Sequence, residues 1–199
     1  MNSTAHEFPV VAIGASAGGP SALENVLSKI PDGLFAAFVI SQHMPNGFTK
    51  AFAVRLAEIS KLKVREAEDG HVLQVGDVLI APAGYNMEIS RGGRIQLSKA
   101  EPNVASPSID SMMRSVANAY GSRSIGVLLT GMLTDGVIGM KTIKDRGGIT
   151  IVQDEASSLV YGMPKAAVEA GAAQYIADIS DIPSKIVTAL TIKNGRKNS

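Results

Sequence analysis

The stretch VVAIGASAGGPSAL, residues 10–23, decides the fold. An apolar, β-branched segment typical of a buried strand ends at Ile13, and a glycine-rich turn follows at residues 14–19. Apolar residues then recur at helical spacing through residues 21–30. The turn between strand and helix carries one serine, Ser16. Such a turn can be a phosphate cradle, a plain tight turn or the seat of a nucleophile.

The same alternation of strand and helix continues along the chain. Strands are predicted at residues 34–41, 124–130, 148–153 and 173–177, and helices at residues 48–60, 109–120, 137–144, 164–170 and 182–192. Strands that alternate with helices form βαβ units, and near-continuous apolar strands are typical of a sheet covered on both faces. Short alternating segments around Gly92-Gly93, within residues 77–99, predict a hairpin added to the sheet. We therefore expect an α/β fold: a doubly wound, mostly parallel sheet flanked by helices, with a small antiparallel β-hairpin.

Composition narrows the class of protein. The 199 residues predict one domain at residues 8–192 between short tails at 1–7 and 193–199. A net charge of +1 and 5% aromatic residues argue against nucleic-acid binding. The absence of cysteine excludes disulfides, thiolate nucleophiles and cysteine metal sites, and we expect no metal and no cofactor. Without a signal peptide or an apolar run near the ~20 residues that span a bilayer, we expect a cytoplasmic protein with no direct membrane insertion.

The spacing of the glycines argues against nucleotide binding. A dinucleotide-binding turn needs G-x-G-x-x-G and a later carboxylate, whereas Gly14, Gly18 and Gly19 do not fit and the next strand ends in VISQH. A phosphate loop would need a lysine in the turn. A plain turn explains the glycines but not Ser16, although a lone serine there is more often a helix cap. Residues 14–18, GASAG, match the G-x-S-x-G nucleophile elbow between strand and helix.

A serine nucleophile needs a base, and the chain has three histidines. His6 lies in the N-terminal tail, and His71 follows a charged turn where we expect it to be exposed. His43 ends the next strand, so it shares the carboxyl-end edge of the sheet with Ser16, where sites of open α/β sheets are built. An isolated histidine there is more often a loop or capping residue. The neighbouring elbow favours His43 as the base.

The third member of a triad is a carboxylate. Asp135 follows the strand at residues 124–130 and precedes a helix, which it could also simply cap. Asp110 and Asp154 are weaker candidates, although Asp154 also follows a strand. The chain order of serine, histidine and aspartate differs from that of α/β-hydrolases and argues against that fold, but triads recur in several orders. Ser16, His43 and Asp135 are the predicted catalytic residues.

Eight ordered segments extend the pattern over nearly the whole chain. They are IGASAGGP, QHMPNGFTKAFAVRL, EAEDG, IAPAGYNMEI, PSIDSMMRSVANAYG, GVLLTGMLTDGVIGM, GGITIVQDEASS and YGMPKAA. Together they resemble the catalytic domain of bacterial chemotaxis protein-glutamate methylesterases of the CheB type. The resemblance implies a serine hydrolase that demethylates glutamate methyl esters on chemoreceptors, releases methanol and also deamidates receptor glutamines. It places the family's nucleophile, base and orienting aspartate on Ser16, His43 and Asp135, and it implies the cytoplasmic helices of a methylated chemoreceptor as partner.

Backbone N–H groups beside the nucleophile are the expected oxyanion donors. The Ala17 N–H follows the nucleophile directly, and the resemblance places the Gly131-Met132 turn nearby, so Met132 is the second candidate. Methionines in the matched loops suit an irregular groove for a receptor helix, although core packing is an equal alternative. An arginine on the helix after His43 could meet acidic receptor residues or be an ordinary solvated charge. These substrate-binding candidates are Met44, Arg55 and Met163.

The sequence also departs from the family pattern. Ala17 stands where the best-known members carry threonine, which removes a side-chain contribution to the oxyanion site. Leu133-Thr134 replaces a common Gly-Asn pair, Asn86 replaces a frequent histidine, and Ser106 replaces an arginine. The changes around Asp135 motivate one alternative to the esterase, a catalytically weak receptor-binding module of the same fold. A hydrolase for small esters is a second alternative.

Length is the largest departure from the family. The common architecture places a phosphorylatable receiver domain and a linker before the esterase, whereas this chain starts only a few residues before its first strand. We therefore expect either an excised domain or a free-standing esterase. A separate receiver domain or a signalling kinase is the regulatory partner that this expectation implies.

Overall fold

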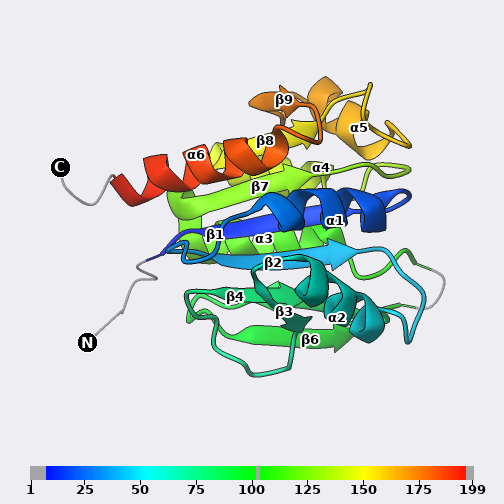
Figure 1. The fold of residues 1–199 in the computed structure, drawn as a ribbon, viewed down its shortest axis with the longest axis vertical. Coiled ribbons are helices and arrows are strands. Elements are labelled where there is room, and N and C mark those ends of the chain that lie inside the picture. Colours follow the sequence, from blue (N-terminus) through cyan, green and yellow to red (C-terminus); the bar gives the residue numbers. More distant parts are fainter. Residues whose placement is uncertain (1–7, 102–103, 196–199) are drawn as a thin grey trace.

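A seven-stranded parallel sheet forms the centre of the protein (Figure 1). A computed structural model describes residues 8–101 and 104–195, so the expected tail at 1–7 and residues 196–199 of the expected tail at 193–199 lie outside the described residues. The order across the sheet is β3-β4-β2-β1-β7-β8-β9, and every neighbouring pair is parallel. The strands are β1 (Val10–Ala15), β2 (Ala37–Gln42), β3 (Lys63–Glu66), β4 (Asp77–Ile80), β7 (Ser124–Leu128), β8 (Ile149–Gln153) and β9 (Tyr175–Ala177).

The strand that leads into the Ser16 turn is the central one. From β1 the chain builds outward through β2 toward β4 and β3, then returns to add β7 on the other side of β1. The point between β1 and β7 is where the strand order reverses, and open α/β sheets form sites at the carboxyl ends of strands at such points. All six residues of β1 are buried, as expected for a strand covered on both faces.

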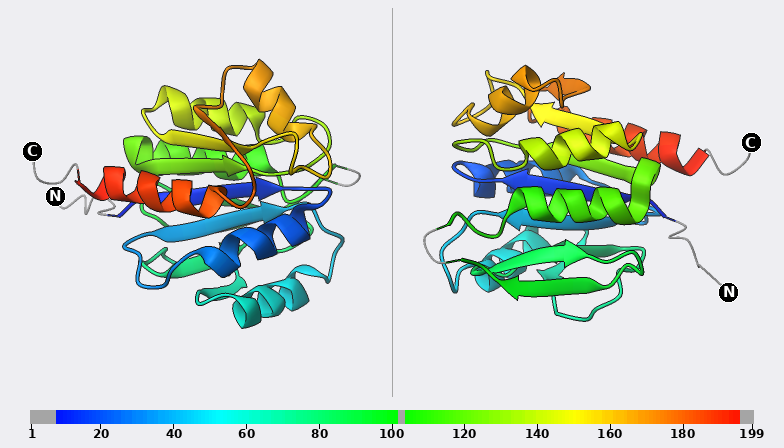
Figure 2. Two further views of the ribbon diagram at one scale, coloured as in Figure 1. Left: turned by 45° about the horizontal axis from the view of Figure 1, so that its top comes forward. Right: turned by 180° about the vertical axis from the view of Figure 1, so that it is seen from behind.

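Helices cover both faces of the sheet (Figure 2). One face carries α1 (Gly19–Lys29), α2 (Thr49–Ile59) and α6 (Ile182–Gly195), and the other carries α3 (Ile109–Tyr120), α4 (Val137–Asp145) and α5 (Met163–Glu169). Alternate residues of β1 point to opposite faces, so Ile13 packs in the first apolar core and Ala12 in the second. This arrangement confirms the doubly wound fold. None of the described helices is long and apolar enough to cross a membrane.

The predicted hairpin is present, but it does not extend the parallel sheet. Strands β5 (Tyr85–Ile89) and β6 (Ile95–Lys99) form a separate antiparallel pair. The pair lies on the α3 side of the molecule, where the Ile89 N–H donates to Ser115 Oγ at 2.9 Å (Figure 2, right). Residues 77–80, which we expected to belong to the hairpin region, form β4 inside the sheet instead. A four-residue strand is too short for its alternation to show which sheet it joins.

The ends of the elements differ slightly from expectation. Helix α3 begins and ends where the sequence predicted, whereas α6 continues to Gly195. Lys193, predicted to start a tail, is only 5% exposed, and its Nζ donates to the Gly147 carbonyl oxygen at 2.8 Å. Strand β3 was not predicted, because it carries three charged residues among its four and lies at the sheet edge.

Candidate functional site

The turn that carries Ser16 is fastened to the end of β7. Ser16 follows the last residue of β1, and its N–H donates to the Thr130 carbonyl oxygen at 3.0 Å. The Thr130 hydroxyl donates in turn to the Ala17 carbonyl oxygen at 2.9 Å. Thr130 therefore holds the backbone before and after the Ser16 side chain through two hydrogen bonds.

Two glycines make this tight turn possible. Gly18 has a φ of 79°, the left-handed region, and a β-carbon there would lie 2.7 Å from Leu159 Cβ. A β-carbon on Gly19 would overlap Gln42 Oε1. The tight bend and the close packing therefore explain why glycine stands at these two positions. Neither explains the serine at position 16.

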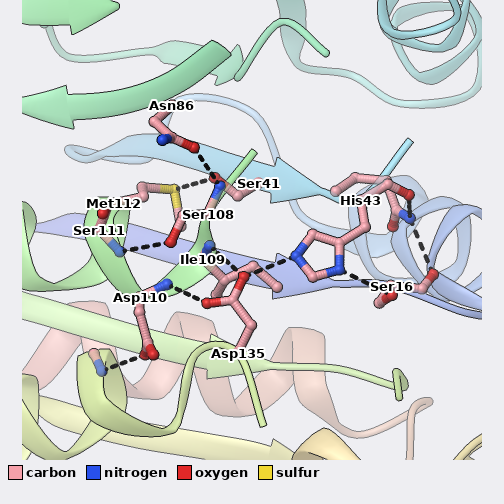
Figure 3. A network of polar contacts seen from close by, with 12 residues as sticks. Ser16, Ser41, His43, Asn86, Ser108, Ile109, Asp110, Ser111, Met112 and Asp135 are labelled. Atoms are coloured by element: carbon pink, nitrogen blue, oxygen red, sulfur yellow. Dashed lines mark hydrogen bonds and ion pairs between the residues drawn. The ribbon is translucent and has the colours of Figure 1, made fainter. Parts of the chain in front are cut away.

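Ser16, His43 and Asp135 lie in one line of hydrogen bonds (Figure 3). His43 Nδ1 is 3.1 Å from Ser16 Oγ, and His43 Nε2 is 2.8 Å from Asp135 Oδ2. The side chains of the histidine and the aspartate are 14% and 21% exposed, so the line is partly shielded from solvent. Each residue follows the carboxyl end of a strand: β1, β2 and β7 in turn.

The orientation of the ring sets its tautomer. A carboxylate only accepts hydrogen bonds, so Nε2 carries the hydrogen and donates it to Asp135. Nδ1 then presents a lone pair to the Ser16 hydroxyl. In the chymotrypsin triad the opposite ring nitrogen faces the serine. Here the imidazole has the reverse orientation, with Nδ1 toward the serine and Nε2 toward the aspartate.

Asp135 is held by a helix distant in sequence. Its Oδ2 accepts from the Ile109 N–H at 2.9 Å, and its Oδ1 accepts from the Asp110 N–H at 2.8 Å, both in the first turn of α3. Burial pushes the pKa of Asp135 upward, but the hydrogen bonds from His43 and these two N–H groups outweigh it and lower the pKa. Asp135 therefore stays ionised beside the imidazole, and it caps α3 rather than the helix that follows it.

The lowered pKa of Asp135 makes part of the stability depend on pH. An acid whose folded pKa lies below its unfolded pKa stabilises the fold above the unfolded value, and this contribution is lost as pH falls through the folded pKa. We expect the difference in free energy of unfolding between wild type and Asp135→Asn to shrink as pH falls from about 7 to about 3. Urea unfolding at both pH values measures it, and a constant difference would contradict the assignment.

The other histidines and carboxylates lie elsewhere. His6 is outside the described residues. The expectation of an exposed His71 is wrong, because its side chain is only 24% exposed and its Nε2 is 2.7 Å from Asp77 Oδ2. Asp77 begins β4, so that pair lies at the opposite edge of the sheet from Ser16. Asp154 accepts from the N–H and hydroxyl of Ser157, within its own loop.

Two backbone N–H groups in the loops beside Ser16 were expected to bind an oxyanion. The Gly131 turn lies beside the serine, since a β-carbon on Gly131 would be 2.8 Å from Ser16 Cβ. The Gly131 N–H donates to the Val160 carbonyl oxygen at 3.0 Å. Within residues 8–101 and 104–195, neither the Ala17 N–H nor the Met132 N–H donates a hydrogen bond. Both N–H groups are therefore free of a competing protein acceptor among the described residues, and their role as oxyanion donors stays a prediction.

The substrate-binding candidates have different surroundings. Met163 is fully buried in the core, so its prediction as a groove residue is wrong and core packing accounts for it. Met44 is half-buried and packs against the other core. Arg55 is exposed, but its Nε donates to Glu24 Oε1 at 2.8 Å, so α1 already supplies its counter-charge. Met132 is 58% exposed.

Residues that the sequence did not single out also support the site. Gln42 Nε2 donates to the carbonyl oxygens of Ser16 at 3.0 Å and His43 at 2.8 Å, which ties the ends of β1 and β2 together. Thr130 does the same between β1 and β7. Both are buried polar residues that close apolar strands at the carboxyl edge, and that position is the signal that could have found them.

Leu133 has a strained backbone two residues before Asp135. Its φ is 64°, and its side chain is 75% exposed. The left-handed region costs a residue with a β-carbon about 1–2 kcal/mol, which glycine partly avoids while losing more chain entropy on folding. We expect Leu133→Gly to raise the free energy of unfolding by up to about 1 kcal/mol in urea titrations. Leu133→Ala is the matched control, because it removes the same exposed side chain and keeps the strain; equal effects would contradict the explanation.

Fold and site together define a class of protein. A doubly wound sheet that carries an aligned serine, histidine and aspartate at its carboxyl edge has the relay of the serine hydrolases. The family described as CheB methylesterase matches residues 11–186, and the chain belongs to this family. The Thermotoga maritima CheB methylesterase catalytic domain has a similar crystal structure, with a TM-score of 0.86 and 38% sequence identity over 91% of this chain and 98% of that one.

Curated relatives extend the comparison. A protein-glutamate methylesterase/protein-glutamine glutaminase from Pyrococcus abyssi is 44% identical over 94% of this chain and 52% of its own length. The protein of the same name from Moorella thermoacetica is 50% identical over 92% of this chain and 44% of its own length. The chain thus spans about half the length of these relatives.

Proposed function

We propose that this chain is the catalytic domain of a protein-glutamate methylesterase, which hydrolyses glutamate γ-methyl esters on chemoreceptors and releases methanol. The observation that carries the proposal is the line of hydrogen bonds from Ser16 through His43 to Asp135, in a chain of the CheB methylesterase family. The Pyrococcus and Moorella relatives carry both activities in their name, so deamidation of receptor glutamines belongs to the proposal.

Acylation begins at Ser16. Its Oγ attacks the ester carbonyl carbon, and its proton passes to His43 Nδ1, 3.1 Å away. Asp135 stabilises the resulting imidazolium through Nε2. When the tetrahedral intermediate collapses, the bond from carbon to the methoxy oxygen breaks, and the Nδ1 proton goes to that oxygen. Methanol leaves, and Ser16 carries the glutamyl acyl group.

Deacylation repeats these steps with water. His43 Nδ1 takes a proton from the water as its oxygen attacks the acyl carbon, and the proton then returns to Ser16 Oγ as the carbon–Oγ bond breaks. The product is a glutamate carboxylate. A glutamine substrate follows the same course with ammonia as leaving group, so the glutaminase activity needs no further catalytic residue.

The oxyanion is held by backbone donors in this proposal. The Ala17 and Met132 N–H groups lie on the two loops beside Ser16, and α1 begins two residues after Ala17 with the positive end of its dipole. One such donor is worth about 3–4 kcal/mol in other serine enzymes. Ala17 supplies its N–H without the hydroxyl of the family's threonine.

The proposed substrate surface surrounds the serine. Met132 and Leu159 are 58% and 77% exposed, and the loops that carry them pack against Ser16 and Gly18 respectively. Exposed apolar side chains beside a reactive group suit the apolar face of an amphipathic helix. We assign them to the cytoplasmic helix of a methylated chemoreceptor, with half-buried Met44 at the margin.

Methanol release tests the proposal directly. A receptor fragment with radiolabelled glutamate methyl esters is incubated with the full chain, and volatile label is counted; we expect release from this fragment and none from an unmethylated one. Binding of the fragment without release would favour the receptor-binding module. Cleavage of small chromogenic esters without cleavage of the receptor would favour the small-ester hydrolase.

A further inference from the structure

Two aspartates cap each other's helices beside the triad. Asp135 lies just before α4 and accepts hydrogen bonds from the first turn of α3. Asp110 lies in the first turn of α3, and its Oδ1 accepts from the Gly139 N–H in the first turn of α4 at 2.7 Å (Figure 3). The Asp110 carboxylate thus accepts an N–H from the first turn of α4, and the Asp135 carboxylate accepts N–H groups from the first turn of α3.

Asp110 takes part in both halves of this exchange. Its own N–H donates to Asp135 Oδ1 at 2.8 Å, while its side chain binds the backbone of α4. The helices meet closely because Gly139 has no side chain: a β-carbon there would overlap Met113 Cβ and would lie 3.3 Å from the Asp110 carbonyl oxygen. Asp110 therefore binds the segment around Asp135 at two points. Its N–H binds the Asp135 carboxylate, and its side chain binds the Gly139 N–H, four residues further along the chain.

Charge does not explain an aspartate at this position. Burial raises the pKa of Asp110, the neighbouring Asp135 carboxylate raises it further, and N–H groups of α4 only partly offset these effects. A negative charge here is electrostatically unfavourable to its neighbour. What the position requires is a hydrogen-bond acceptor of the right length, which asparagine supplies equally well.

We propose that Asp110 is a positioning residue of the triad: by bridging α3 and α4 it fixes the Asp135 carboxylate at hydrogen-bonding distance from His43. Asp110 touches neither the substrate nor the imidazole in this assignment. Its effect on turnover rests on the proposed function, whereas its effect on the bond between Asp135 and His43 does not.

Two variants of Asp110 test the assignment in the full chain. In Asp110→Ala we expect kcat for methanol release from the methylated receptor fragment to fall by about 10- to 100-fold, since misplacing a catalytic group by about 1 Å has effects of that size. KM should stay unchanged. The proton signal of the His43 Nε2–H, observed by NMR, should shift upfield as its bond to Asp135 weakens. Asp110→Asn, which keeps the acceptor, should recover most of the rate and the signal.

Asp178→Ala is the matched control. Asp178 Oδ1 also accepts a backbone N–H, that of Ser180 at 2.8 Å, but in the turn before α6. It should change neither the His43 signal nor kcat. If Asp110→Ala does not fold, Asp110→Glu replaces it, because the longer side chain displaces the acceptor.

The outcomes separate the two proposals. A wild-type His43 signal and rate in Asp110→Ala, or an Asp110→Asn as impaired as Asp110→Ala, would overturn the positioning role. If the wild type releases no methanol from the methylated receptor fragment, the proposed function fails, and the NMR signals of the same variants still decide the role of Asp110.

Discussion

Replacement of Ser16 by alanine should reduce methanol release from a methylated receptor fragment by about 10⁵- to 10⁶-fold, as in other serine hydrolases that lose the nucleophile. The change removes the Oγ atom that lies 3.1 Å from His43 Nδ1 and forms the acyl-enzyme. It leaves the Ala17 and Met132 N–H groups in place, so residual hydrolysis by water at the oxyanion site remains. The rate is measured as volatile methanol at saturating substrate.

Ser21→Ala is the matched control for this prediction. Ser21 lies in the first turn of α1, five residues after the nucleophile and exposed, and its loss should leave the rate unchanged. Circular dichroism and thermal unfolding establish that both variants fold. Equal rates for wild type and Ser16→Ala would remove Ser16 from the mechanism.

Asp135→Asn should lower kcat by about 10⁴-fold while the fold is kept. Three hydrogen-bond donors converge on this carboxylate: His43 Nε2, the Ile109 N–H and the Asp110 N–H. An amide offers one accepting oxygen and an NH₂ group that only donates. If the NH₂ faces the imidazole, the ring must move its hydrogen to Nδ1, which then has no lone pair for the serine. If it faces α3, the helix loses an acceptor.

The pH profile and a second variant support this measurement. The rate of Asp135→Asn should stay low across the pH range in which the wild type is active. The His43 ring carries its hydrogen on the wrong nitrogen in this variant, and a change of pH does not correct that. Asp154→Asn is the control, since the Asp154 carboxylate accepts hydrogen bonds from Ser157 in its own loop and the variant should keep the wild-type rate. A rate for Asp135→Asn within a factor of about ten of wild type would contradict the role of the carboxylate.

The meeting of Ser16, His43 and Asp135 could be predicted because parallel strands end at a common edge. Each residue follows an apolar strand, so strand position alone brings them to one place, across sequence separations of 27 and 92 residues. The direction of the imidazole could not be predicted in this way. It depends on where the first turn of α3 holds Asp135, a tertiary contact with no local pattern.

The predictions that failed concern burial rather than chemistry. Met163 was a groove candidate because its segment matches the family, but helix α5 places it against Gly131 in the core. His71 was expected in solvent after a charged turn, yet it folds back onto Asp77, an acceptor only six residues away. The hairpin of β5 and β6 was predicted correctly as a pair, and its place on α3 depends on long-range packing.

The reversal of strand order also determines when this chemistry can begin. Ser16 and His43, the proposed nucleophile and base, both precede residue 44, but β7, which pairs with β1 and leads to Asp135, starts only at Ser124. A chain that emerges from the ribosome amino end first carries serine and histidine long before the carboxylate that orients them exists. We therefore expect a nascent chain that lacks Asp135 to leave nearby esters intact. Pairing of β7 with β1 brings the segment that leads to Asp135 to the same edge of the sheet, before β8 and β9 extend the sheet further.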